Sequence, residues 1–160
     1  MTVRLSFRNR QRIRPLDLAQ LRHVVRDLLT TEFPTRRAEL CFHLVAAPEM
    51  ARVNQTFLQH AGSTDVITFN HADTAPADSF HGEVFICLAD AVAQAKQFRT
   101  TWQSELVRYV IHALLHLRGY DDRTPAARRK MKREENRLLR QMARRFPLRR
   151  LSRPLARLRP

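Results

Sequence analysis

A chain of 160 residues is long enough for one compact domain with its own buried core. Its composition, 44% hydrophobic and 28% charged residues, excludes wholesale disorder, and no apolar stretch approaches the roughly 20 residues of a membrane helix. The N-terminus lacks the apolar region of a secretory signal. Cys41 and Cys87 form no CxxC pair, which favours reduced thiols and a cytoplasmic location.

The net charge of +14 is concentrated at the C-terminal end. Residues 1–122 carry 14 basic and 13 acidic side chains, whereas residues 123–160 carry 15 basic and 2 acidic ones. A segment with this imbalance attracts polyanions, and above all nucleic acid. A solvated basic helix that aids only solubility is the alternative.

The N-terminal part of the chain predicts two strands and a helix. Hydrophobic and polar residues alternate from Thr2 to Arg8, the pattern of a half-buried edge strand. Pro15 then opens a helix with an apolar stripe at helical spacing. Residues Glu39 to Val45 are largely apolar on both faces, which predicts a strand inside a sheet.

The middle of the chain predicts a second helix, two strands and a loop. Pro48 begins the helix. Residues 64–69 and 83–88 are rich in β-branched or other apolar side chains and predict short strands. Between them, residues 70–80 have the composition of an exposed loop. A further helix follows the second of these strands.

Two long helices come last. Thr100 and Gln103 have the spacing of a capping box at the start of the first helix. Gly119 suits the left-handed position that ends it. Thr124 followed by Pro125 predicts the start of the second helix, with a hydroxyl cap and a proline in the first turn.

These elements predict an α+β fold in which a single small mixed sheet of about four strands packs with about five helices. From residue 147 onward, Pro, Arg and Leu alternate without a period. The predicted organisation is therefore one domain over residues 1–146, followed by a basic, disordered tail over residues 147–160.

The stretch from His112 to Asp122 carries the clearest chemical signal. His112 and His116 are four residues apart on a predicted helix, so both imidazoles project from one face and can bind one metal ion. Gly119 lets the chain reverse, so that Asp121 or Asp122 can return as a third ligand. Two histidines and a carboxylate with an open position form a zinc-type catalytic layout. Packed, hydrogen-bonded histidines are the alternative.

The motif HxxLHLxGYD in this stretch resembles the metal motif of the YbeY family, bacterial zinc-dependent endoribonucleases that act in ribosomal RNA maturation. The segments TDVITF at residues 64–69 and GEVFI at residues 82–86 are similar to further family segments. The resemblance covers roughly residues 1–140. It implies that His112, His116 and Asp122 bind one zinc ion per chain, with Asp122 in place of the family's third histidine.

The resemblance also implies the function. It points to a single-strand-specific endoribonuclease that processes the 3′ end of small-subunit ribosomal RNA, serves ribosome quality control and hydrolyses phosphodiesters with metal-bound water. Its implied partners are single-stranded ribosomal RNA and either ribosomal proteins or a ribosome-assembly GTPase, with no membrane. The basic C-terminal helix and tail would grip RNA. The fold would be reminiscent of zincins, with the metal site on a central helix.

Four positions depart from the family pattern: Leu58, Glu83, Ala113 and Asp122. A carboxylate remains a competent zinc ligand, but Asp122 adds negative charge and should make the metal a weaker Lewis acid. Leu58 stands where the family places an arginine of the active-site cleft. Losing that guanidinium would weaken phosphate positioning, unless Arg52 or Arg118 replaces it in space.

The catalytic proton acceptor is not evident from the sequence. Ala113 occupies the position at which HExxH proteases carry a glutamate base. Asp121 and Asp65 are candidate acceptors, although turn capping and strand entry are alternative roles for them. Two other functions remain open. One is a zinc-binding ribosome-associated factor with weak or no catalysis, and the other is a metalloprotease-like hydrolase.

Overall fold

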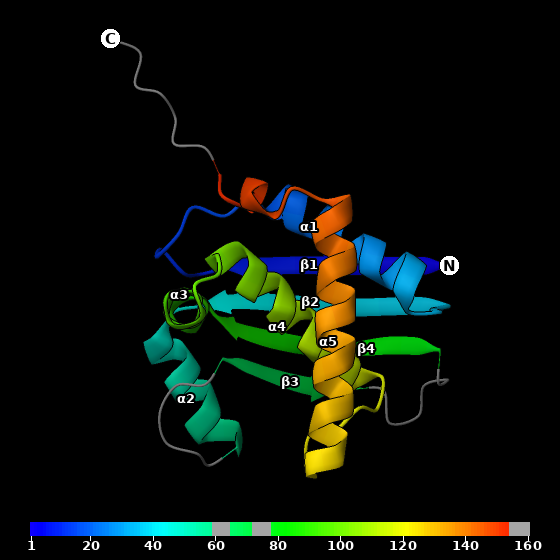
Figure 1. The fold of residues 1–160 in the computed structure, drawn as a ribbon. Helices are drawn as coiled ribbons and strands as arrows, with labels where there is room; N and C mark the ends of the chain where they lie inside the picture. The colour runs from blue at the N-terminus through cyan, green and yellow to red at the C-terminus, as the bar shows by residue number, and fades with distance from the viewer. Residues whose placement is uncertain (59–64, 72–77, 154–160) are drawn as a thin grey trace.

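One four-stranded sheet organises the described part of the chain, which comprises residues 1–58, 65–71 and 78–153 of the computed structural model (Figure 1). Its strands are β1 (Thr2–Asn9), β2 (Arg37–Val45), β3 (Val66–Asn70) and β4 (Ser79–Cys87). They lie in the order β1-β2-β4-β3. The first three in this order are parallel, and β3 pairs antiparallel with β4 at one edge. The predicted mixed sheet is confirmed, with β1 at an edge and β2 inside.

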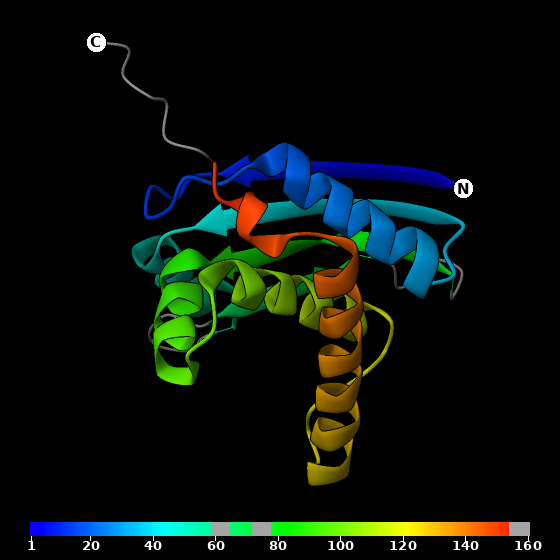
Figure 2. The same cartoon turned by 45° about the horizontal axis from the view of Figure 1, so that its top comes forward.

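Five α-helices accompany the sheet in the described residues: α1 (Leu18–Asp27), α2 (Ala47–Leu58), α3 (Leu88–Phe98), α4 (Trp102–Leu117) and α5 (Pro125–Arg145). A π-helical turn, η1 (Leu28–Glu32), continues α1, and a 3-10 turn, η2 (Leu148–Leu151), follows α5. Figures 1 and 2 show α1, α4 and α5 on the same face of the sheet. No helix in these described ranges has the length and hydropathy that crossing a membrane requires.

The two faces of the sheet differ because side chains alternate along each strand. On the helix-covered face, the inner strands contribute to one large buried cluster with residues of α1, α4 and α5. Its members from β2 and β4 include Leu40, Phe42, Leu44, Val84 and Ile86. On the opposite face, Met50 of α2 joins a smaller cluster with Val45 and Cys87. Helix α2 therefore covers one end of that face, and polar side chains occupy much of the rest.

Helix α4 crosses the middle of the sheet (Figure 1). Its N-cap is Thr101, whose hydroxyl accepts a backbone N–H from the first turn. The capping box predicted at Thr100 is wrong by one residue, because the Thr100 hydroxyl instead donates to the Glu105 carboxylate at 2.8 Å. After α4, Gly119 has a φ of +101°. This is the predicted left-handed conformation, and it reverses the chain.

Helix α5 begins as predicted, with the Thr124 hydroxyl accepting a backbone N–H from the first turn. Its apolar stripe of Met131, Leu138 and Met142 is buried. The same stripe also buries Glu135, which is 6% exposed. A carboxylate at that depth requires a partner, and its partner lies on α4.

The chain after α5 is packed, where the sequence predicted a disordered tail from residue 147. Turn η2 buries Leu148 and Leu151 in the main cluster. The carbonyl of Leu151 accepts the backbone N–H of Asp17 at 2.8 Å, and the N–H of Arg153 donates to the carbonyl of Pro15. Two leucines three residues apart share one face of a 3-10 turn, a pattern too short to stand out as a period. The packed structure thus continues through Arg153, and residues 154–160 lie outside the described part.

Candidate metal centre and nucleic-acid cleft

The structure brings together the three side chains predicted as metal ligands. His112 and His116 project from one face of α4, with their Nε2 atoms 3.1 Å apart. Asp122 follows the chain reversal at Gly119, and its Oδ2 lies 3.8 Å from Nε2 of His116. The donor atoms of all three residues lie within 4.8 Å of one another. A helix and a short turn are sufficient to assemble this set.

The spacing and protonation of these donors suit one metal ion. Two nitrogen ligands about 2.0–2.1 Å from a tetrahedral zinc ion lie about 3.3 Å apart, close to the separation of the two imidazole nitrogens. Burial lowers the pKa of His116, and the neighbouring His112 lowers it further. A lowered pKa favours the neutral imidazole, which is the form that binds metals. The residues present therefore fit the metal that the motif implies.

Glu135 of α5 orients the first histidine. Its side chain is 8% exposed, and its Oε2 lies 2.7 Å from Nδ1 of His112. A carboxylate at Nδ1 favours the proton on that nitrogen, which leaves the lone pair of Nε2 facing His116. Glu135 was not identified from the sequence. The available signal was a charged residue four positions after Met131, within the apolar stripe of the last helix.

Arg108 joins α4 to α5 one turn before His112. Its Nη1 donates to Oδ1 of Asn136 at 2.8 Å and lies 3.7 Å from the Glu135 carboxylate. Its Nε lies 3.8 Å from the Glu105 carboxylate. The role of Arg108 was not evident from the sequence, although residues four apart share one helix face. The guanidinium is thus held in place beside the metal-ligand cluster.

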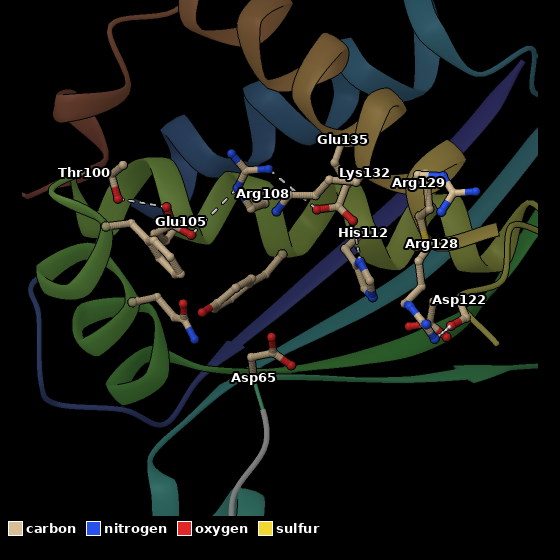
Figure 3. Close-up of a pocket in the computed structure, with 14 residues that line it drawn as sticks. Asp65, Thr100, Glu105, Arg108, His112, Asp122, Arg128, Arg129, Lys132 and Glu135 are labelled. Atoms are coloured by element: carbon tan, nitrogen blue, oxygen red, sulfur yellow. Dashed lines mark hydrogen bonds and ion pairs between the residues drawn. The ribbon is translucent and has the colours of Figure 1, made fainter. Parts of the chain in front are cut away.

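A cleft of about 740 Å³ opens beside the metal-ligand cluster. Asp65, His112 and Asp122 line this cleft, and the same three residues line an adjoining hollow of about 460 Å³. Four basic side chains from α4 and α5 form what we call the basic wall: Arg108, Arg128, Arg129 and Lys132. Figure 3 shows Asp65 across the cleft from Arg108 and Lys132. The cluster therefore lies where two hollows meet, in a cleft that four basic and four acidic side chains line.

The two candidate proton acceptors lie in different surroundings. Asp121 is exposed, and its Oδ1 accepts the backbone N–H of Arg123 at 3.1 Å. This contact is that of a turn cap. Asp65 precedes β3, where its Oδ1 accepts the N–H of Val66 at 2.8 Å. Asp65 also lines both hollows, so it is the candidate that the fold brings to the cleft.

The arginines considered as replacements for the family arginine lie elsewhere. Leu58 is the last residue of α2, and its side chain is outside the described part of the structure. The Arg118 guanidinium lies 4.2 Å from the ring centre of Phe80 and donates to the carbonyl of Pro34. Neither Arg118 nor Arg52 is among the residues lining the two hollows. Arg108 is the α4 arginine that lines the cleft.

Comparison with known proteins reveals relatives along most of the chain. A family model described as "Endoribonuclease YbeY" matches residues 6–143. Endoribonuclease YbeY of Salinibacter ruber is 34% identical over 141 residues, which cover 84% of this chain and 89% of that protein. Endoribonuclease YbeY of Chlorobium phaeovibrioides is 33% identical over 140 residues, covering 88% and 90%.

A solved structure has a similar fold. The solution structure of TM1509 from Thermotoga maritima matches with a TM-score of 0.67. The match covers 98% of this chain and 100% of that one, at 21% sequence identity. At this identity the likeness concerns the fold alone.

Proposed function

Because this chain belongs to the YbeY family of endoribonucleases, we propose that it hydrolyses phosphodiester bonds within single-stranded RNA in the cleft beside α4. The observation that carries this proposal is the meeting of His112, His116 and Asp122 within 4.8 Å, where two hollows join. We propose ribosomal RNA precursors as the substrate, cut at the 3′ end of the small-subunit RNA. Ribosome quality control, with ribosomal proteins or an assembly GTPase as partners, belongs to the same proposal.

We propose that His112, His116 and Asp122 hold one zinc ion. Imidazole and carboxylate ligands suit zinc, and three protein ligands are the usual number at catalytic zinc sites. When bound, the ion would activate water for attack and neutralise charge that develops on phosphate oxygens. A carboxylate as the third ligand supplies more negative charge than a histidine does, so the ion would be a weaker Lewis acid here.

The chain's own residues position the substrate and manage protons. Glu135 holds His112 in the orientation that presents Nε2 to the cluster. Asp65 faces the same space from the start of β3, and we propose it as the proton acceptor. The basic wall would bind the phosphates that flank the scissile bond, because arginine donates in pairs to phosphate oxygens.

Arg108 is our proposed substitute for the family arginine that Leu58 replaces. It lies one turn from His112, and Asn136 and two carboxylates hold its guanidinium at the cleft. A guanidinium that is already positioned loses little entropy when it binds phosphate. The proposal therefore does not require an arginine at the end of α2.

The test compares zinc content and RNA cleavage for the wild type, Asp122→His and Asp122→Ala. We expect the wild type and Asp122→His to bind one zinc ion at His112, His116 and residue 122 and to cleave a labelled single-stranded RNA but not its duplex. Asp122→Ala should lose roughly 100-fold or more in zinc affinity, since even outer partners of a ligand contribute 10–100-fold. Normal zinc binding by Asp122→Ala would exclude Asp122 as a ligand. A zinc-loaded wild type that cleaves no RNA would favour a non-catalytic ribosome-associated factor.

The basic wall makes a separate prediction. Replacing Arg129 and Lys132 together by glutamine should weaken binding of single-stranded RNA and lower its salt dependence by about 0.7 per charge removed. Zinc content should not change. The matched control replaces Arg140 and Arg144 by glutamine, because both are exposed on the same helix and do not line the cleft. Equal losses for the two pairs would assign RNA binding to overall charge and not to the basic wall. Fluorescence anisotropy across a salt series measures both effects.

A further inference from the structure

A second cluster of metal-ligating side chains lies on the face of the sheet opposite α4. Cys41 of β2 is paired in register with Glu83 of β4, and His43 lies two residues further along β2. Since side chains alternate along a strand, all three project from the same face. Their donor atoms lie within 4.8 Å of one another. We propose that Cys41, His43 and Glu83 form a second site for a transition-metal ion, with His71 as its fourth ligand.

The distances between these donors suit tetrahedral zinc. Sγ of Cys41 lies 3.4 Å from Nε2 of His43, which lies 2.9 Å from Oε1 of Glu83. Ligand atoms around tetrahedral zinc lie about 3.3–3.6 Å apart for these atom types, so small side-chain movements would suffice. His71 follows the last residue of β3, and its Nε2 lies 3.2 Å from the other Glu83 oxygen. The His71 side chain is 45% exposed, and its rotation toward Cys41 and His43 would bring this imidazole to the same ion.

The chemistry of the donors selects the class of ion. A thiolate, two imidazoles and a carboxylate suit zinc and its neighbours, whereas magnesium and calcium prefer oxygen ligands alone. Four protein ligands would close the coordination shell, which is the arrangement of structural zinc sites. The site would therefore tie the end of β3 to the two central strands without taking part in hydrolysis.

The surroundings of His43 restrict its movement. The imidazole is 9% exposed and stacks on the ring of Phe85, with ring centres 4.2 Å apart and planes 7° apart. This packing holds Nε2 toward Cys41 and Glu83. Because His43 is held in place, only the Glu83 carboxylate and the His71 side chain would have to move when the ion binds.

Arg10 is the interaction that metal binding would have to displace. Its Nη2 lies 3.1 Å from Nδ1 of His43, and a guanidinium can only donate, so Nδ1 accepts and Nε2 carries the proton. An ion at Nε2 would take the place of that proton, and Nδ1 would then be protonated. Arg10 would keep its ion pair with Glu49, which includes contacts of 2.7 and 3.0 Å. Losing the His43 contact would thus leave Arg10 paired.

Cobalt binding tests this site independently of the metal-ligand cluster on α4, which we call the α4 centre. A cysteine ligand gives Co²⁺ a thiolate charge-transfer absorption in the near ultraviolet, and the cluster of His112, His116 and Asp122 contains no sulfur. We expect the wild type to bind about two Co²⁺ per chain, one of which produces the band. His116→Ala should lose one ion and keep the band. The proposed function and this proposal can therefore fail separately.

The two cysteines provide a matched pair of variants. Cys41→Ser should abolish the band, whereas Cys87→Ser, which changes the buried cysteine of the small cluster, should retain it. If Cys41→Ser does not fold, the wild type still decides the question. Zn²⁺ should displace the Co²⁺ ion and so abolish the band. It should also protect Cys41 from alkylation by iodoacetamide. The proposal is overturned if saturating Co²⁺ gives no band, if the band persists without Cys41, or if Zn²⁺ leaves alkylation of Cys41 unchanged.

Discussion

Replacing His116 by alanine is expected to remove zinc from the α4 centre and to lower RNA cleavage by about 10³-fold or more. The variant keeps only two of the three proposed ligands. A catalytic metal supplies several kcal/mol of transition-state stabilisation, and each 1.36 kcal/mol that is lost lowers the rate about tenfold. The fold should persist, because the His116 side chain is 30% exposed and is not among the buried residues of α4. Elemental analysis and single-turnover cleavage measure the two losses.

Glu135→Gln should also lower metal affinity, but by less than the loss of a ligand does. The amide retains the shape of the carboxylate but loses its charge, so it should hold His112 less firmly and lower metal affinity by about 10–100-fold. Glu134→Gln is the matched control, since the adjacent carboxylate pairs with Arg137 and not with His112. Wild-type cleavage by His116→Ala would contradict the metal centre. Equal effects of the two glutamine variants would remove the specific role of Glu135.

Deleting residues 147–160 is expected to destabilise the whole domain and not merely to remove a tail. The deletion takes Leu148 and Leu151 out of the core, where they are 9% and 0% exposed. Truncating one buried leucine to alanine costs about 2–5 kcal/mol, so losing both should cost about 4 kcal/mol or more. A loss of this size is a large fraction of the stability of an ordinary domain, about 5–15 kcal/mol.

A deletion confined to residues 154–160 is the control for this effect. It keeps the hydrogen bonds at Asp17 and Pro15 together with both leucines, so the free energy of unfolding should change by less than about 0.5 kcal/mol. Urea unfolding of the two truncated chains measures the difference. Equal stability of both deletions and the full chain would show that η2 contributes nothing to the core. The shorter deletion also tests whether the basic residues after Arg153 bind RNA, because it leaves the packed structure intact.

The sequence by itself determined the parts of the site that depend on local geometry. A spacing of four residues places His112 and His116 on one helix face, and a glycine after the helix returns the chain so that Asp122 meets them. The start of α5 at Thr124 followed equally directly, from a hydroxyl cap and a proline in the first turn. In each case the relevant atoms are set by a few consecutive backbone dihedral angles, and residue type and spacing alone constrain these angles.

Only the tertiary structure decided which distant residues complete the sites. Glu135 reaches His112 from 23 positions away, and Glu83 meets His43 across 40 positions. The Leu151 carbonyl accepts its hydrogen bond from Asp17, the N-cap of α1. Arg108 lines the cleft because α5 packs beside α4. These contacts follow from which strands pair and which helix faces meet. Such choices minimise the free energy of the whole core, so no single segment's periodicity contains them.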